Sequence, residues 1–406
     1  MNEAPSQFWI VGAWLAADSR TAVRANLAIS SQGRIECITH DDPPESASRL
    51  LRLENHLILP GLINSHDHLE FNLFPRLGRG PYVNYSAWAH DICRPDKSPV
   101  RDHLAVPKSV RLWWGGLKNL LSGVTTVCHH NPYDAVFENG FPVQVVRRYG
   151  WAHSILFEKD VHRMFAATDR GVPFIIHAGE GTDRQSRDEL YELDRIGVLD
   201  RRTILVHGVA FSNEDHALRE QRGAALVWCP TSNRFILGTT LDFKLLSSSQ
   251  RIALGSDSAL TGQGNLLDEI RVAHHDGVPA DNLYTMVGET AASILLLSDG
   301  EGSIRPGAIA NLIAVPWTGT TPGATPAETL VQLDAHEISA VIVSGRVHLA
   351  TSGIAAILPD TERIGLEWIS VDGVEYRVRA PIQWLMSETL AHLGNDIRLA
   401  GRKVSA

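Results

Sequence analysis

The feature that most constrains this 406-residue sequence is a regular alternation of strand-like and helix-like segments between about residues 60 and 300. Short apolar runs alternate there with amphipathic stretches such as 110–122 and 187–197. Strands and helices in regular alternation predict an α/β domain built on a parallel sheet. The predicted strands are 62–69, 123–130, 151–157, 173–179, 202–208, 224–230 and 251–257.

These seven predicted strands are one fewer than a closed (β/α)₈ barrel contains. Only 16 residues separate the strand that ends at Phe157 from the strand that begins at Phe174. Either one strand is missing there, or a weak strand escapes the pattern. We therefore expect a distorted (β/α)₈ (TIM-like) barrel over residues 60–301.

Two β-rich segments, 1–59 and 302–375, flank the predicted barrel. A segment of about 50 residues is marginal for a domain that folds alone. We therefore expect the two segments to form one composite β-sandwich. Residues 376–406 are expected to be a C-terminal helical segment, because 384–398 have a helical pattern.

Composition and charge exclude several classes of protein. The formal charge is −9 and no basic cluster occurs, which argues against a nucleic-acid partner. No apolar run is long enough to span a membrane, and the N-terminus lacks the basic region of a signal peptide. The four cysteines are scattered, with no CxxC pair. We expect a cytoplasmic homo-oligomer (a dimer or larger) that acts on a small molecule.

Histidines and an aspartate mark the ends of four predicted strands. Residues i and i+2 of a strand point to the same face, so His66 and His68 can reach one ion. A lone pair of this kind is more often two ordinary polar residues than a metal site. Here His177, His207 and Asp257 end three further strands, and the carboxyl ends of parallel strands meet at one edge. Nitrogen and carboxylate donors together suit Zn²⁺ or Fe²⁺ better than Mg²⁺ or Ca²⁺.

Several motifs resemble those of the amidohydrolase superfamily. PGLINSHDHLEF at 60–71 is similar to its first metal motif, and VHG (206–208), CPTSNRFILG (229–238) and LGSDSA (254–259) are similar to those of strands six to eight. GSIRPGAIANLIAV and VIVSGRV resemble its composite β-sandwich. The resemblance covers roughly residues 8–350 and is strongest for the branch with one metal, which includes chlorohydrolases and cytosine, guanine and adenosine deaminases.

The resemblance implies one Zn²⁺ or Fe²⁺ per chain and a role for each strand-end residue. It assigns Glu180 to proton transfer, His207 to orienting the nucleophile and stabilising an oxyanion, and Asp257 to accepting a proton from water. Glu180 and His207 would also contact the substrate. Lys159, an alternative bridging ligand in a two-metal branch, lies in a segment that has the pattern of a helix start. The implied metal ligands are His66, His68, His177 and Asp257.

The reaction that these residues favour is hydrolytic deamination of an aminated heterocycle. Ammonia leaves poorly unless it is protonated, and Glu180 is placed to supply the proton. Hydrolysis of a cyclic amide, an imidazolone-like ring or a carbon–halogen bond is the alternative reaction. A non-catalytic binding protein is a more remote alternative, since every ligand position is filled. His130 and Arg76 are further candidates for contacts with the substrate. His130 could equally belong to a loop that merely packs there, and an exposed loop arginine such as Arg76 is more often just solvated.

Overall fold

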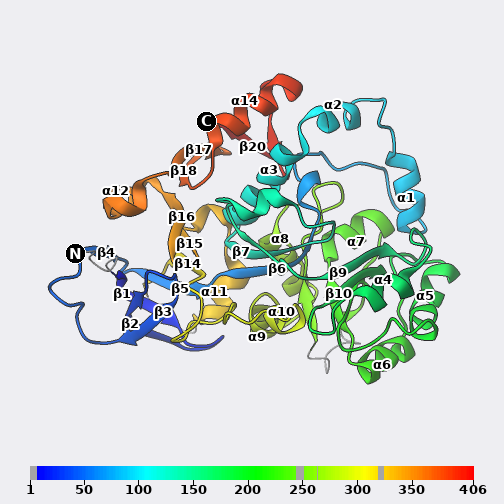
Figure 1. Cartoon of the computed structure of the whole chain (residues 1–406), viewed down its shortest axis with the longest axis horizontal. Coiled ribbons are helices and arrows are strands. Elements are labelled where there is room, and N and C mark those ends of the chain that lie inside the picture. The colour runs from blue at the N-terminus through cyan, green and yellow to red at the C-terminus, as the bar shows by residue number, and fades with distance from the viewer. Residues whose placement is uncertain (1–6, 244–250, 263, 319–323) are drawn as a thin grey trace.

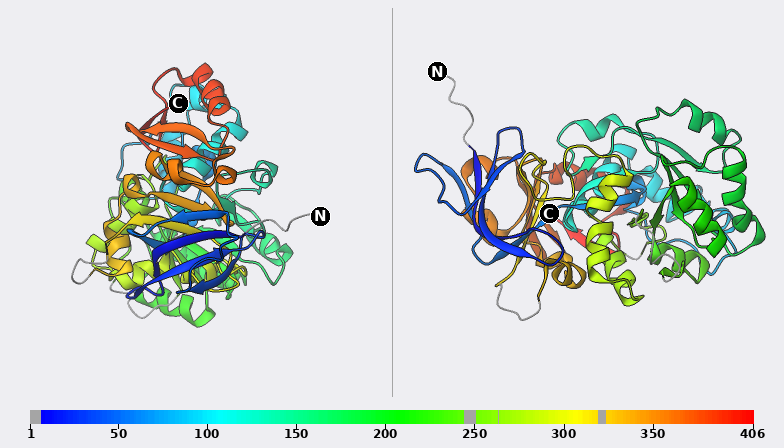
Figure 2. Two further views of the ribbon diagram at one scale, coloured as in Figure 1. Left: turned by 90° about the vertical axis from the view of Figure 1, so that its left-hand side faces the viewer. Right: turned by 90° about the horizontal axis from the view of Figure 1, so that it is seen from below.

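The computed structural model describes residues 7–243, 251–262, 264–318 and 324–406. Figure 1 shows two regions: a sheet made from both ends of the chain, and a larger α/β region made from its middle. The view from below in Figure 2 separates the two regions most clearly. Among the helices of the described residues, none has both the length and the apolar character needed to cross a bilayer.

The α/β region contains two parallel sheets. One sheet has the order β6-β7-β8 and the other has the order β13-β12-β11-β10-β9, and every pair of neighbours runs parallel. Together they supply eight strands in chain order. The strands are β6 (Leu62–Asp67), β7 (Val124–His129), β8 (Gln144–Val145), β9 (Gly150–Ser154), β10 (Phe174–Ala178), β11 (Thr203–His207), β12 (Ala225–Trp228) and β13 (Ile252–Leu254).

Helices connect these strands, as the alternation predicts. Three of them, α1 to α3, lie between β6 and β7, and three more follow β13. The helices of this region are α1 (Tyr85–Ile92), α2 (Val100–Ala105), α3 (Lys108–Leu121), α4 (Val161–Ala167), α5 (Arg184–Arg195), α6 (Asn213–Arg222), α7 (Pro230–Leu237), α8 (Leu266–His275), α9 (Ala280–Met286) and α10 (Glu289–Ile294).

The strand absent from the sequence prediction is β8, and it lies before Phe157 rather than after it. The interval between Phe157 and Phe174 contains helix α4, whose first turn is capped by the Asp160 side chain accepting from the Arg163 N–H. Strand β8 has only two residues, Gln144 and Val145, which is too short for period-two alternation to reveal it. The weak-strand alternative therefore describes this chain.

The two β-rich ends of the chain meet in one twelve-stranded sheet. The junction is the antiparallel pair β5–β14, in which Leu59 lies opposite Ile313. The two-layered sandwich and the domain limits stay predictions. The strands are β1 (Phe8–Ala16), β2 (Ala22–Ile29), β3 (Ile35–Thr39), β4 (Arg49–Arg52), β5 (His56–Pro60), β14 (Leu312–Pro316), β15 (Ala340–Val343), β16 (Arg346–Thr351), β17 (Glu367–Val371), β18 (Val374–Val378), β19 (Arg398–Leu399) and β20 (Arg402–Ser405).

The C-terminal segment 376–406 is less helical than expected. Its helix α14 (Ile382–Leu393) ends before the predicted 398, and β19 and β20 follow it. Strand β20 pairs with β17, so this end of the chain returns to the terminal sheet. Gly394, with φ of 67°, ends the helix at a conformation that favours glycine. The remaining helices are α11 (Pro326–Gln332), α12 (Ser352–Ile357) and α13 (Asp360–Arg363).

Candidate metal centre and active site

The predicted ligands come together at the carboxyl edge of the parallel strands. His66 lies in β6 and His68 directly after it, while His177 and His207 lie at the ends of β10 and β11. Asp257 follows β13 and its N–H donates to the carbonyl of His66 over 3.1 Å. This hydrogen bond holds the first and last strands of the α/β region side by side at the site.

The donor atoms form two overlapping groups that share His66, and the atoms of each group lie within 4.8 Å of one another: His66, His68, His130 and His177 in one, and His66, His207 and Asp257 in the other. Nε2 of His66 lies 3.3 Å from Nε2 of His177 and 3.7 Å from Oδ1 of Asp257. Nε2 of His68 lies 3.9 Å from the same oxygen. Ligands about 2.0–2.2 Å from one Zn²⁺ lie roughly 3–4 Å from each other. The residues therefore fit a divalent transition ion.

The protonation states of these groups also fit a metal site. Burial, together with the neighbouring histidines, lowers the pKa of His66 and of His177 well below the ordinary value. Both imidazoles are therefore neutral at pH 7, which is the form that binds a metal. Burial alone would raise the pKa of Asp257, but His68, His207 and the hydrogen bond from Ser232 outweigh it and lower that pKa. Asp257 is thus ionised.

Helix α7 supplies two partners that position the site. The Ser232 hydroxyl donates to Oδ2 of Asp257 over 2.7 Å, and Thr261 donates to the same oxygen over 3.0 Å. Nδ1 of His207 lies 2.8 Å from Oδ1 of Asn233, so Nδ1 carries the proton and donates it. Nε2 of His207 is then the nitrogen with a free lone pair. Ser232 and Asn233 belong to the CPTSNRF motif, but their roles depend on contacts that the sequence does not show.

Glu180 faces His207 inside the site. Its Oε2 lies 3.5 Å from Nε2 of His207, and its side chain is buried. Burial, with smaller contributions from Asp257 and Glu189, raises the pKa of Glu180 well above its ordinary value. Burial therefore favours the protonated carboxylic acid, which is the form that can donate a proton. Gly179, which precedes Glu180, has φ of 67°, a conformation that favours glycine. A Cβ added there would lie only 2.6 Å from the Phe211 ring, so the site also requires the absence of a side chain.

Two site residues have a backbone conformation that is uncommon for residues other than glycine. The φ angles are 80° at His207 and 52° at Asp257. Such conformations cost free energy and persist where the surrounding structure fixes them. Both residues are also held by the side-chain hydrogen bonds of α7. The local structure is therefore built to aim these two side chains.

A buried ion pair lies beneath the site. Nζ of Lys118, on α3, lies 3.1 Å from Oδ2 of Asp67, the residue between His66 and His68. The same ammonium donates to the Ser256 hydroxyl over 2.8 Å and to the carbonyl of Asp257 over 3.2 Å. Lys118 thus joins the two strands that carry ligands. A single lysine within the apolar stretch LWWGGLKNLL is the one sequence signal that could have indicated it.

A small cavity of about 100 Å³ opens onto these groups. Glu180, His207 and Asp257 line one part of it, and an aromatic wall forms another part. Helix α1 closes over the cavity, because the N–H of Tyr85 donates to the carbonyl of Glu180 over 3.1 Å. The aromatic wall consists of Phe71, Tyr85 and Trp88. A flat ring would find both stacking surfaces and polar partners there.

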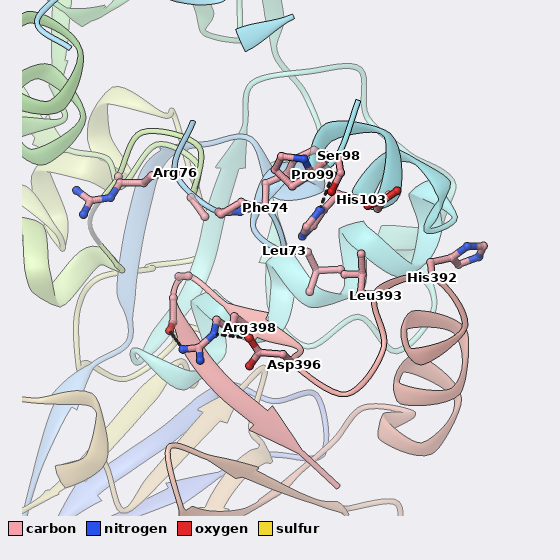
Figure 3. Close-up of a pocket in the computed structure, with 16 residues that line it drawn as sticks. Leu73, Phe74, Arg76, Ser98, Pro99, His103, His392, Leu393, Asp396 and Arg398 are labelled. Carbon is pink, nitrogen blue, oxygen red and sulfur yellow. Dashed lines mark hydrogen bonds and ion pairs between the residues drawn. The ribbon is translucent and has the colours of Figure 1, made fainter. Parts of the chain in front are cut away.

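The other three candidate residues, His130, Arg76 and Lys159, lie in different surroundings. His130 lies beside the candidate ligands: ring nitrogens of His66, His68, His130 and His177 are all within 4.8 Å of one another. Arg76 does not line the small cavity. It is exposed, stacks over Phe235 and lines a neighbouring pocket of about 490 Å³, where it points away from Asp396 (Figure 3). Lys159 is exposed after β9, which does not suit a bridging ligand.

Comparison with known proteins agrees with this geometry. Residues 157–348 match the model of the amidohydrolase family. The 5-methylthioadenosine/S-adenosylhomocysteine deaminase of Natronomonas pharaonis is 27% identical over 230 residues, which is 50% of this chain and about half (53%) of the relative. The deaminase of the same name from Syntrophobacter fumaroxidans is 24% identical over 67% of this chain and 74% of its own length.

Solved structures share the fold. A zinc-bound adenosine deaminase from Xanthomonas campestris superposes with a TM-score of 0.68 at 16% identity, over 95% of this chain and 97% of that one. At this identity the likeness concerns the fold alone. The family match covers His177, Glu180, His207 and Asp257, and the HDH motif precedes it. The resemblance seen in the sequence is therefore confirmed over residues 157–348, the part of the chain that matches the amidohydrolase family.

Proposed function

We propose that this protein is a metal-dependent aminohydrolase that converts a heterocyclic C–NH₂ group to C=O and releases ammonia. The observation that carries the proposal is the position of Glu180. It is a buried acid 3.5 Å from His207, and it shares one small cavity with Asp257 and His177. The names of the deaminase relatives support the same reaction. At a carbon–halogen bond the same acid would still activate the ring nitrogen, but the halide would leave without a proton.

The metal centre is proposed as one Zn²⁺ or Fe²⁺ per chain, held by His66, His68, His177 and Asp257. When bound, a divalent ion lowers the pKa of water from about 16 towards ~7 and so supplies a nucleophile at neutral pH. The donor set of imidazole and carboxylate suits both ions. The homo-oligomeric state and the cytoplasmic location stay expectations.

The residues of the cavity then divide the proton transfers between them. Glu180, protonated by virtue of its burial, donates to a ring nitrogen as water adds to the carbon that carries the amino group. Asp257, ionised, accepts a proton from that water. Nε2 of His207, which has the free lone pair, accepts a hydrogen bond from the hydroxyl that adds and so orients it. The proton held by Asp257 then passes to the amino group, and the hydroxyl proton of the adduct returns to Glu180. The C=O bond forms as the C–N bond breaks, ammonia leaves as a neutral molecule, and both carboxyl groups are restored.

A screen for released ammonia tests the proposal. Metal-loaded protein is incubated with aminated purines, pyrimidines, pterins and triazines, and with their chlorinated counterparts. We expect ammonia from at least one aminated ring and a loss of roughly 10²-fold or more in kcat for Glu180→Gln, with the metal content unchanged. Chloride release without ammonia from any aminated ring would instead support the dehalogenation alternative.

A further inference from the structure

His130 is held rigidly at the end of β7, next to the proposed ligands. Its backbone N–H donates to the carbonyl of Asp67 over 3.0 Å, which fixes it against the HDH strand. Its ring nitrogen Nε2 lies 3.0 Å from the carbonyl of Ala152, on β9. The residue is 1% exposed. Two backbone contacts thus determine where the imidazole lies.

The tautomer of His130 follows from these contacts. A carbonyl oxygen can only accept, so Nε2 carries the hydrogen that is donated to Ala152. Nδ1 then has a lone pair. This nitrogen is buried and has no hydrogen-bond partner among the described residues. A buried lone pair without a partner is costly, and an ion is one of the few groups that could satisfy it here.

The surroundings of the ring point to the metal centre. Its centroid lies 4.3 Å from that of His177 and 5.0 Å from that of His66. One ring nitrogen of His130 is within 4.8 Å of a ring nitrogen of each of the three proposed histidine ligands. His153 differs: its ring lies 4.8 Å from that of His177, yet it belongs to neither group of candidate ligands found among the described residues.

We propose that His130 is an additional metal ligand, which binds through Nδ1 and gives the centre four imidazoles and one carboxylate. The inference rests on the proposed metal dependence and deepens it. Typical structural zinc sites have four protein ligands, and this set would exceed four. Such a nitrogen-rich set suits divalent transition ions that accept five or six donors, such as Fe²⁺, Co²⁺ or Ni²⁺.

The most direct test uses the unmodified protein. X-ray absorption of the chain loaded with Co²⁺ or Zn²⁺ counts coordinated imidazoles through their multiple-scattering pattern. We expect four imidazoles, and three would overturn the inference. Protein that retains no metal at all would contradict the proposed function itself, so the two failures can be told apart.

A pair of variants provides the second test. His130→Gln should lose one imidazole from the absorption pattern and bind Co²⁺ at least about tenfold more weakly in competition with a chelator. The visible bands of bound Co²⁺ should also change, because they depend on the number and type of ligands. His153→Gln, which removes an imidazole 4.8 Å from that of His177 against 4.3 Å for His130, is the matched control and should bind Co²⁺ unchanged. Equal affinities and spectra for wild type and His130→Gln would refute the assignment, as would a weaker affinity with the imidazole count unchanged.

Discussion

The edge of the parallel strands that carries the candidate ligands and the terminal sheet differ in the groups that they bury. The edge gathers buried nitrogens that have no partner among the described residues, such as Nδ1 of His66 and of His177, and it contains two residues with positive φ. The terminal sheet instead buries apolar side chains such as Ile10, Leu27 and Leu312. Its non-glycine residues with positive φ, which are Ser344, Asp372 and Ala400, lie in turns between strands. Its unpartnered buried nitrogens, such as Nε1 of Trp9, belong to no cluster of candidate metal ligands among the described residues. Departures from local rules concentrate at functional sites. The comparison indicates that the edge is arranged for a ligand and the terminal sheet for stability.

Removal of a ligand at the edge should have the largest effect. His177→Ala removes one of the four proposed metal ligands, so the protein should lose its metal and its activity together. Elemental analysis and ammonia release measure the two. The terminal sheet should be unaffected, so far-UV circular dichroism at 25 °C should stay close to that of the wild type. If the variant kept both its metal and its turnover, His177 would not be a metal ligand.

Removal of the proton carrier should separate chemistry from metal binding. Glu180→Gln keeps the shape of the side chain but cannot transfer a proton, so kcat should fall by roughly 10²–10⁴-fold with the metal retained. His207→Asn should lose roughly 10²-fold, because Nε2 no longer orients the hydroxyl that adds to the substrate. Steady-state ammonia release measures both variants. Near-normal turnover by Glu180→Gln would argue against deamination.

The ion pair beneath the edge should affect stability more than chemistry. Lys118→Met leaves Asp67 charged and buried, since the side chain of Asp67 is inaccessible. Loss of one partner of a buried pair costs about 3–5 kcal/mol in the free energy of unfolding. Urea unfolding measures this change, and Lys118→Met combined with Asp67→Asn should recover part of it. A loss below about 1 kcal/mol would show that the pair does not hold the two strands together.

A histidine of the terminal sheet should contribute a pH dependence that is independent of the metal. Burial lowers the pKa of His348 to about 4, whereas the unfolded chain has about 6.5. Below pH 6.5 the unfolded state binds a proton that the folded state does not bind, so stability falls as the pH drops from 6.5 to 4. The loss is roughly 3 kcal/mol.

His348→Gln should flatten that part of the stability curve. Denaturant unfolding at pH values between 4.5 and 7.5 measures the slope, and His40→Gln is the control, because His40 is exposed. An acid slope that is the same in both variants would show that other groups cause it.

The sequence alone predicted those features that are local. The convergence of His66, His68, His177 and Asp257 at one edge could be predicted, because residue type and position at the end of a strand are both visible in the sequence. Their role as metal ligands stays a prediction. The positions of α3 and α5 followed from their amphipathic pattern, with bounds that differ from the structure by one to three residues. Strand β8 escaped because two residues carry no periodicity.

Other features depend on contacts between distant segments. The hydrogen bonds of Ser232 to Asp257 and of Asn233 to His207 join residues 25 and 26 positions apart. The pair formed by Lys118 and Asp67 spans 51 positions. Nothing in the local pattern around His130 distinguishes Nδ1 from Nε2, which only the carbonyl of Ala152 determines. Tertiary packing, rather than any motif, places these groups.

The metal content of protein purified without a chelator tests the central claim most directly. The strand-end residues are proposed to hold one ion, so elemental analysis should find one transition metal, zinc or iron, per chain. Ammonia release should scale with that content as the metal is removed and restored. Two tightly bound ions per chain, or undiminished ammonia release by fully metal-free protein, would contradict the account.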